Sequence, residues 1–495
     1  MKTNIRKLGK DGLIYGLGIA ISRAASFVML PIYTTYLTPA DYGAAELLTT
    51  TIDVIAMIVG LGITGAIFKC YADAGTDDEK KEVISTSLVI LLVLTLIASL
   101  IGIVFSGPIS GLIFGDRTFS KYFQLMFVTF FIQQGITSIP LMYIRAIGRP
   151  HLFVMIGVVK LLVHIALNLY FLVVLKLGLE GVLLSSLIGE AVIGVFLLSY
   201  SLRHIGFRFS RIIADELFKL GHPFILTSLS SFVLVYSDRY FLKAFNDLDT
   251  IGIYALAYKF GFMLSALVVV PFQSAWEPQR FSIAKQEDGK TIFTRVFLYF
   301  NVVIVSVSLM IILSVGDILK IIASKPYWPA SVLVPLMLIN AVLQSWTIFC
   351  DYGLYHARKT GSIASSSVIA AVLVLALNIV LIPIWGVYGA VLATFCAFLV
   401  RFWLRYIWAQ RYFTIDYGWR KIFGLIMVAA VAYFVRFSMD IHNIAVALVF
   451  DSIVFVAYIL TAYYAILDRF ERDTIRSFLK EKLTATRKVG SDYIL

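Results

Sequence analysis

The segment Val83-Ile-Ser-Thr-Ser-Leu-Val-Ile-Leu-Leu-Val-Leu-Thr-Leu-Ile-Ala-Ser-Leu-Ile-Gly-Ile-Val-Phe105 contains no charged residue. A helix needs about 20 apolar residues to cross the hydrocarbon core of a bilayer, so this segment predicts a transmembrane helix. The same pattern recurs along the chain. Of 495 residues, 60% are hydrophobic and 15% are charged, whereas soluble domains carry about 25% charged residues. The sequence therefore predicts an all-α integral membrane protein.

About fourteen such segments follow one another, joined by loops that are too short to hold a soluble domain. Their predicted ranges are 11–36, 44–68, 83–105, 121–144, 152–175, 179–202, 222–245, 251–273, 293–314, 331–351, 362–384, 387–409, 420–437 and 443–467. The first is not expected to be a cleavable signal peptide, because Arg23 interrupts a run that is already too long. The cysteines, Cys70, Cys350 and Cys396, have no metal-ligand spacing and form no disulfide pattern.

The basic residues predict the orientation, since loops rich in Lys and Arg stay in the cytoplasm. We placed the N-terminus inside and assigned residues at span ends to the adjoining loop. Then 29 of the 42 basic residues fall in cytoplasmic segments, 7 in outer loops and 6 within spans. Both termini are therefore expected in the cytoplasm. The net charge of +12 follows from this topology and from attraction to anionic lipid headgroups, so no nucleic-acid partner is expected.

The chain also contains an internal repeat with a spacing near 210 residues. Four pairs match in order: Asp41-Tyr-Gly43 with Thr250-Ile-Gly252, Arg149 with Lys359, Leu167-Asn168 with Leu377-Asn378, and Gly178-x-x-Gly181 with Gly386-x-x-Gly389. The repeat predicts two six-helix halves. Because six is an even number, both halves enter the membrane from the same side. Transporters built from parallel repeats bind substrate near the midplane, between their halves.

We therefore expect two parallel six-helix bundles around a central cavity, followed by two further helices. The expected boundaries are 1–210 for the N-terminal bundle, 211–411 for the C-terminal bundle, 412–467 for the additional helices and 468–495 for a cytoplasmic tail. Such a protein would expose a central site alternately to each side of the membrane.

Ionisable residues deep within spans mark candidate functional sites, because they must face protein or water. By depth and sign, the candidates for binding an anionic substrate are Arg23, Lys160 and Lys259, together with Asn168, which shares a helical face with Lys160 and His164. The candidates for ion coupling or charge balance are Glu46, Asp53, Glu190, Asp238 and Arg239. No metal site is expected.

Structural interpretations stay open for several of these residues. Glu190 would simply neutralise Lys160, and Asp238 with Arg239 would form an ion pair near the membrane surface. The pair Glu46 and Asp53, which shares a face of one helix, either alternates between a cation and a cavity base or makes a plain hydrogen bond between helices. Separate alternatives are that His164 serves packing and that Arg401 with Arg405 snorkels to the inner headgroups.

The run Pro31-Ile-Tyr-Thr-Thr-Tyr-Leu-Thr-Pro-Ala-Asp-Tyr-Gly43 resembles the signature region of bacterial polysaccharide transporters. These are the O-antigen-type flippases of the multidrug/oligosaccharidyl-lipid/polysaccharide exporter superfamily. Ser237-Asp-Arg-Tyr-Phe241, at the matching place in the second half, is also similar to that family's pattern. The resemblance extends over the whole chain. Its motifs are moderately specific for the family and do not identify the sugar.

The resemblance implies a flippase that moves an undecaprenyl-diphosphate-linked oligosaccharide from the cytoplasmic to the outer leaflet of the bacterial inner membrane by alternating access. It also implies a basic central cavity for the diphosphate and contact with membrane lipids and other polysaccharide assembly proteins. The family is divergent at that cavity, so Arg23, Lys160 and Lys259 rest on depth and sign alone. No cofactor is expected beyond a coupling ion, H⁺ or Na⁺.

Two other classes remain open. A multidrug exporter of the same superfamily would share the two six-helix halves, but it would favour acidic residues at the centre and would not need the extra helices. A membrane glycosyltransferase or polymerase would need a catalytic carboxylate or metal site in a large outer loop, and no outer loop exceeds about 16 residues. A phosphate-binding loop of the Gly-x-x-x-x-Gly-Lys type is also missing from the sequence. We therefore expect a transporter, not an enzyme.

Overall fold

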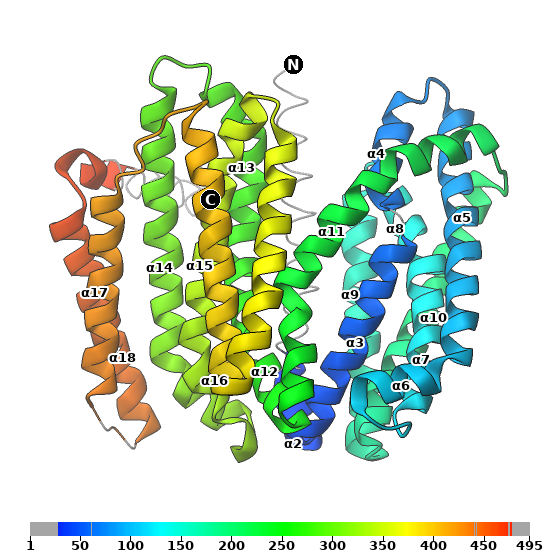
Figure 1. The fold of residues 1–495 in the computed structure, drawn as a ribbon, viewed down its shortest axis with the longest axis horizontal. Helices are drawn as coiled ribbons and strands as arrows, with labels where there is room; N and C mark the ends of the chain where they lie inside the picture. The colour runs from blue at the N-terminus through cyan, green and yellow to red at the C-terminus, as the bar shows by residue number, and fades with distance from the viewer. Residues whose placement is uncertain (1–27, 61, 440, 442, 474–475, 478–495) are drawn as a thin grey trace, which may run out of the picture. The chain divides into compact units, whose positions relative to one another are not determined.

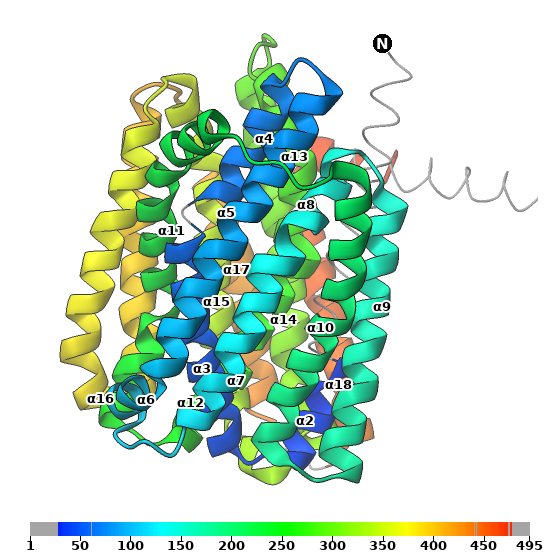
Figure 2. The same cartoon turned by 90° about the vertical axis from the view of Figure 1, so that its right-hand side faces the viewer.

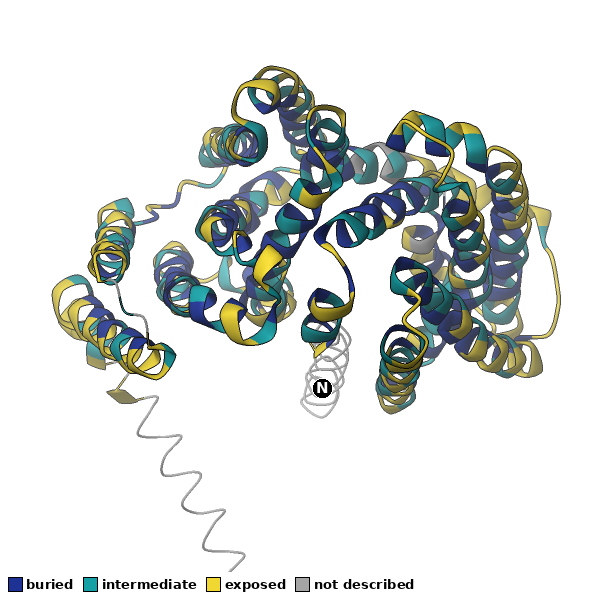
Figure 3. Cartoon of the chain, turned by 90° about the horizontal axis from the view of Figure 1, so that it is seen from below, coloured by how far each residue is buried: buried dark blue, intermediate teal, exposed yellow. Residues whose placement is uncertain are grey.

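The computed structural model describes residues 28–60, 62–439, 441, 443–473 and 476–477, and these residues form helices joined by short loops (Figure 1). Ten of the described helical segments are long and apolar enough to cross a membrane. Many large hydrophobic side chains are exposed, among them Leu112, Val195 and Phe434, and exposed residues lie along the faces of many helices (Figure 3). Such surfaces suit contact with lipid rather than with water. The structure therefore confirms an all-α membrane protein.

In the first 210 residues, the helices are α2 (Leu30–Tyr36), α3 (Pro39–Val59), α4 (Ile63–Asp73), α5 (Asp77–Val104), α6 (Ser106–Phe114), α7 (Ser120–Phe130), η1 (Phe131–Thr137), α8 (Ser138–Ala146), α9 (Pro150–Asn168), η2 (Leu169–Val174) and α10 (Gly178–Ile205). The later helices are α11 (Arg211–Phe245), α12 (Leu248–Leu264), η3 (Ser265–Val269), α13 (Val270–Ile283), α14 (Gly289–Ile322), η4 (Lys325–Tyr327), α15 (Ala330–His356), α16 (Thr360–Gln410), α17 (Trp419–Phe437), α18 (Ile444–Thr461) and η5 (Ala462–Ile466). Each predicted span from the second onward overlaps at least one of these helices.

One predicted span is interrupted. The expected helix at 44–68 is divided into α3 and α4, because the chain turns at Gly62, whose φ of 66° lies in the left-handed region. Glycine adopts this conformation at little cost, whereas a side chain would clash there. The helix that the sequence predicted as one piece is therefore two, and α4 packs against α5 and α11.

The predicted spans 362–384 and 387–409 are the two arms of α16. The chain reverses at Gly386, which has φ 53° and ψ −126°. A Cβ added to Gly389 would overlap the backbone of Leu381 and Ile382, although residues eight apart are about 12 Å apart along a continuous helix. The two arms are therefore antiparallel, and the close turn between them requires glycine.

The chain divides into two compact units. The larger one comprises Met1–Glu277 and Leu319–Phe413, and the smaller one comprises Pro278–Ile318 and Thr414–Leu495. Within the larger unit, α5, α7, η1 and α10 pack together, and α11 packs along α16 (Figures 1 and 2). This division groups most of α14 with α17 and α18. The boundaries expected from the repeat, at 210, 411 and 467, stay a prediction.

Within the smaller unit, Arg436 of α17 lies between two buried carboxylates. Its guanidinium donates a 2.9 Å hydrogen bond to Asp317 of α14 and a second hydrogen bond to Asp451 of α18. One cation therefore joins three helices, which gives this unit a polar core of its own.

The two helices that contain the first repeated motif, α3 and α12, begin in similar ways. At α3, the Asp41 backbone N–H donates to the Thr38 hydroxyl at 3.1 Å, and the Asp41 carboxylate accepts from the Thr38 backbone N–H. At α12, the Thr250 backbone N–H donates to the Asp247 carboxylate at 2.9 Å. Hydrogen bonds of this kind satisfy backbone donors that have no partner inside the helix. The residues Thr38 and Asp247 are 209 positions apart, which matches the repeat spacing.

Helices α3 and α12 cross at two repeated glycines. A Cβ added to Gly43 would overlap the Leu248 carbonyl oxygen, and a Cβ added to Gly252 would overlap the Pro39 carbonyl oxygen. Each glycine therefore allows the backbone of the other helix to approach closely. The contact is reciprocal, because each repeat presents the same position to the other.

Other repeated positions also share their backbone geometry. Gly148 and Arg358, at offset 210, both have positive φ, at 67° and 55°. Gly178 and Gly386, at offset 208, have φ of 56° and 53°. The local structure of these turns is thus repeated along with the sequence.

Candidate functional site

Lys259, predicted as a cationic site residue, lies between two tyrosine rings. Its ammonium group is 4.8 Å from the ring centroid of Tyr42 on α3 and 5.8 Å from that of Tyr33 on α2. It forms no ion pair with any residue that the structure describes. The ring faces attract the cation by their quadrupoles but leave its charge unneutralised. Lys259 is thus a partly buried cation that a bound anion would stabilise.

Asn168 lies near the same place. Its side chain is buried and donates a 2.8 Å hydrogen bond to the His164 carbonyl, within α9. It also interacts with the side chain of Tyr33. Two of the predicted substrate residues, Asn168 and Lys259, therefore flank one tyrosine, although they come from different predicted halves.

Glu46, Asp238 and Arg239, predicted as charge-balancing residues, form one buried network. The Arg239 guanidinium donates to Glu46 at 3.1 Å and to Asp238 at 2.7 Å, and Tyr254 donates its hydroxyl hydrogen bond to Asp238. Arg239 is fully buried, and its guanidinium carbon lies 4.3 Å from the ring centroid of Tyr258. The predicted ion pair of Asp238 with Arg239 is present. Its link to Glu46 on α3 was not foreseen.

Glu46 and Asp53 differ in their surroundings. The Glu46 carboxylate pairs with Arg239 and acts electrostatically on Lys259. Asp53, seven residues further along α3, has an exposed side chain and forms no ion pair with the described residues. The two carboxylates are separated by about 10 Å along the helix. Only Asp53 is therefore available to bind a cation from solution without breaking an ion pair.

Lys160, the second predicted cation, is already paired. Its ammonium group forms an ion pair with Glu190 of α10, which is buried. The His164 ring packs against Gly189, the residue before Glu190. A Cβ added to Gly189 would lie 2.8 Å from the Nε2 atom of His164. This geometry fits the interpretation that Glu190 neutralises Lys160. Arg23, the third predicted cation, lies outside the described residues.

The expectation that Arg401 and Arg405 snorkel to the headgroups is wrong. Both side chains are buried. Arg405 donates to both oxygens of Asp351, at 2.8 and 3.0 Å, and to Ser366 and Ser367, at 2.9 Å each. Asp351 on α15 supplies the carboxylate that makes an interior position favourable. The sequence offered no sign of this partner, 54 positions away.

Sequence reasoning also missed the aromatic residues around Lys259. Tyr33 and Tyr42 both lie within the motif 31–43, where they were noted only as part of a family pattern. Tyrosines are common near membrane surfaces, so neither stood out. Their spacing of nine residues, across a helix start at Pro39, gave no reason to expect that both rings contact one lysine.

With this geometry established, the chain can be compared with known proteins. A family model described as "Polysaccharide biosynthesis protein" matches residues 8–284, which is more than half of the chain. The chain belongs to the polysaccharide biosynthesis protein family. A curated relative, the probable low-salt glycan biosynthesis flippase of Haloferax volcanii, is 21% identical over 428 residues, which cover 84% of this chain and 86% of the relative.

Solved structures share the fold of this family member. The lipid II flippase MurJ in its inward closed conformation superposes with a TM-score of 0.71 at 12% identity, over 91% of this chain and 99% of MurJ. An inward-facing multidrug resistance transporter of the MATE family gives a TM-score of 0.64 at 15% identity, over 80% and 97% of the two chains. At such low identity the likeness shows the fold alone, and that fold serves both flippases and drug exporters.

Proposed function

We propose that this member of the polysaccharide biosynthesis family is a flippase. It translocates an undecaprenyl-diphosphate-linked oligosaccharide from the cytoplasmic to the outer leaflet of a bacterial inner membrane, for the synthesis of a cell-surface polysaccharide. It works by alternating access, has both termini in the cytoplasm and catalyses no covalent reaction. The flippase relative in Haloferax volcanii supports the class of substrate.

The observation that carries this proposal is the position of the Lys259 ammonium group beside two aromatic rings. The ammonium group sits between Tyr33 and Tyr42, with no ion pair among the residues that the structure describes. A buried cation of this kind favours a site that receives an anion. A diphosphate headgroup supplies two negative charges, whereas the oligosaccharide part of the substrate is accommodated by polar groups such as Asn168.

The carboxylates favour an anionic substrate over a cationic drug. Glu46 and Asp238 are both engaged by Arg239, so neither is free to bind a cationic drug. Of the carboxylates predicted at the site, Asp53 alone is exposed and outside any ion pair of the described residues. A single free carboxylate suits a coupling ion, H⁺ or Na⁺. The multidrug exporter therefore remains the alternative on grounds of fold only.

The membrane potential favours the proposed direction. With the cytoplasm negative, moving two negative charges outward releases about 4–5 kcal/mol per 100 mV. The lipid tails stay in the bilayer while the headgroup crosses, so they need no cavity. The membrane potential does not favour the return of the empty cationic site. A cation bound at Asp53 would neutralise the Asp53 carboxylate during that step.

The test is made in a strain that lacks the gene. Mass spectrometry should detect an accumulated lipid-linked glycan, and wild-type protein should clear it. We expect Lys259→Ala to lower surface polysaccharide by about 10–100-fold, the loss that follows from one charge-assisted hydrogen bond. Lys259→Arg keeps the charge and should restore part of the flux.

The matched control is Lys325→Ala, which removes an exposed lysine of η4 and should complement fully. Protein abundance in the membrane is measured for every variant. Full complementation by Lys259→Ala would move the substrate site elsewhere. A deletion strain that accumulates no lipid-linked glycan but becomes sensitive to cationic drugs would replace the flippase by the exporter.

A further inference from the structure

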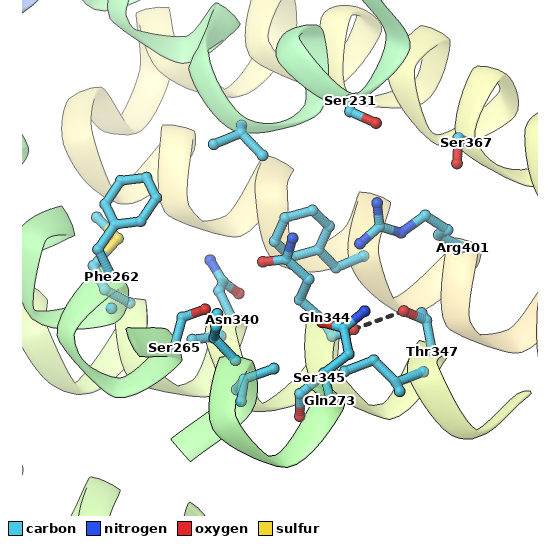
Figure 4. Close-up of a pocket in the computed structure, with 18 of the residues that line it drawn as sticks. Ser231, Phe262, Ser265, Gln273, Asn340, Gln344, Ser345, Thr347, Ser367 and Arg401 are labelled. Carbon is cyan, nitrogen blue, oxygen red and sulfur yellow. Dashed lines mark hydrogen bonds between the residues drawn. The ribbon is translucent and has the colours of Figure 1, made fainter. Parts of the chain in front are cut away.

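A cavity lies within residues 231–405. Its volume is about 460 Å³, and its walls come from α11, α12, η3, α13, α15 and α16 (Figure 4). Binding sites for small molecules occupy about 300–1,000 Å³. The walls belong to the second predicted half alone. Tyr33 and Lys259, on which the proposed function rests, are not among its lining residues.

The lining is unusually polar for the interior of a membrane protein. Gln344, Asn340 and Thr347 of α15 face Arg401 of α16 across the cavity (Figure 4). The amide groups of Gln344 and Asn340 can donate hydrogen bonds to an oxyanion, whereas the Thr347 hydroxyl already donates to the Gln344 carbonyl at 2.8 Å. A cavity that served only to pack helices would be lined by apolar side chains, so these donors indicate a polar occupant.

The charges on the lining do not cancel. Three charged side chains border the cavity, namely Asp351, Arg401 and Arg405. Arg405 takes both oxygens of Asp351 in a bidentate pair. One positive charge, that of Arg401, is therefore left over in the lining.

Arg401 itself has no hydrogen-bond acceptor among the residues that the structure describes. Its side chain is 6% exposed, and its Nε has no partner among the described residues. The guanidinium contacts the Phe398 ring, 4.8 Å from its centroid, and it forms no ion pair within the described part of the chain. A buried charge without a partner is costly, and the guanidinium points towards the polar lining (Figure 4).

We propose that this cavity binds an oxyanion, a phosphate or a carboxylate, against the guanidinium of Arg401. The planar fork of arginine binds either group through two parallel hydrogen bonds. Gln344 and Asn340 donate to the remaining oxygens. The oxyanion belongs to a free anion or to an acidic sugar of a transported glycan, and both present the same chemistry to Arg401.

The occupant also lies next to the charge network described above. Tyr258 lines the cavity, and Arg239 lies 4.3 Å from the centroid of that same ring. A bound anion is therefore separated from the Arg239–Glu46 ion pair by one aromatic ring.

The test uses the purified full-length protein and its thermal unfolding. Sodium phosphate, sodium glucuronate, glucose and sodium chloride are compared at matched ionic strength. We expect phosphate or glucuronate to raise the Tm of wild type by about 2–4 °C over chloride, as saturating ligands do. In the Lys259→Gln background, which removes the cation of the proposed substrate site, the rise should persist, and adding Arg401→Gln should abolish it. Protection by phosphate alone assigns a phosphate ligand, and protection by glucuronate alone assigns a sugar carboxylate.

A second pair of variants separates a ligand site from a structural arginine. Without added anion, Arg401→Gln should unfold at a temperature no lower than wild type, because it removes an uncompensated charge, whereas Arg405→Gln should unfold earlier, because it strands Asp351. Arg401→Lys keeps the charge without the fork and should need about tenfold more phosphate. An equal rise in wild type and Arg401→Gln, or a rise with chloride or glucose as large as with the oxyanions, would overturn the proposal. So would the absence of any rise.

Discussion

The Arg239 guanidinium donates a 3.1 Å hydrogen bond to Glu46, a residue 193 positions earlier in the chain. The bond joins α11 to α3, and thus the two predicted halves of the family fold. Arg239 is fully buried and holds Asp238 as well. Breaking a buried ion pair is costly, so the Arg239–Glu46 pair holds the two predicted halves together at this point.

Glu46→Gln and Arg239→Gln should therefore destabilise the protein together in a non-additive way. Residues of one ion-pair network show coupling energies of about 1–3 kcal/mol. Thermal unfolding of the single and double variants measures this coupling. Asp53→Asn is the control, since Asp53 lies on the same helix without an ion pair, and it should be additive with Arg239→Gln. If the effects of Glu46→Gln and Arg239→Gln on the free energy of unfolding were additive, the ion pair would contribute no coupling between the two helices.

Asp53→Asn should slow transport while leaving the protein folded and inserted. The exposed carboxylate of Asp53 is available to bind a coupling cation, whereas the neutral amide of the Asn variant cannot bind a proton in its place. Flux of the lipid-linked substrate in vesicles, with and without a proton or sodium gradient, measures the effect. The variant should lose the dependence on the gradient that the wild type shows. If Asn at both 46 and 53 gave wild-type flux, neither carboxylate would take part in coupling.

Gly43→Ala and Gly252→Ala should each destabilise the crossing of α3 and α12. The added methyl group meets backbone carbonyl oxygens, which cannot rotate away as a side chain would. Overpacking of this kind costs about 1–3 kcal/mol, seen as a lower unfolding temperature. Gly361→Ala, where an added Cβ meets nothing within 4 Å, is the matched control and should be neutral or stabilising. A Gly43→Ala protein as stable as the control would contradict the close crossing.

Arg436→Gln should be among the most damaging single changes in the smaller unit. It removes the cation between the buried carboxylates Asp317 and Asp451, a loss of about 3–5 kcal/mol for a buried pair. The comparison is Lys121→Gln, which breaks an exposed contact with Glu180 in the larger unit and should cost about 0–1 kcal/mol. Unfolding temperatures in one detergent give the difference, and equal effects would mean that the Arg436 cluster is dispensable.

Reporter fusions test the topology. Tyr327 donates a 3.2 Å hydrogen bond to the Leu37 carbonyl, so the loops at Thr38 and Lys325 lie at one end of the larger unit, and the crossing of α3 and α12 places Asn246 beside them. Fusions at these three positions should read outside. Fusions at 76, at 288 and at the C-terminus should read inside. Inverted signals at 38 and 76 would reverse the orientation inferred from the basic residues.

The fold was largely predictable because a bilayer allows few solutions. A charge-free run such as 83–105 can only form a buried or a membrane helix. The repeat predicted how these helices are grouped along the chain. The interruption at Gly62 was missed, because a glycine inside an apolar run does not reveal its φ angle. The reversal at Gly386 was foreseen as a boundary between spans, and its repeat partner Gly178 has the same geometry.

Individual residues of the site were predictable from the sequence, but the ion pairs that they form were not. Depth within a span identified Glu46 and Arg239, yet no spacing in the sequence relates positions 193 apart. Arg401 was assigned to the membrane surface, because Asp351, which makes its surroundings polar, lies on another helix. Pairings of this kind depend on how helices pack, and a single sequence does not contain that information.

The reciprocal contact of Gly43 with the start of α12, and of Gly252 with the start of α3, has a consequence for how this chain arose. A contact in which each copy offers the same surface to the other is the kind that a twofold-symmetric homodimer makes. An ancestor that corresponded to one predicted six-helix half and paired with itself would already have made this contact. Joining two copies of its gene would then have preserved an existing interface, including the close approach of the two backbones at these glycines.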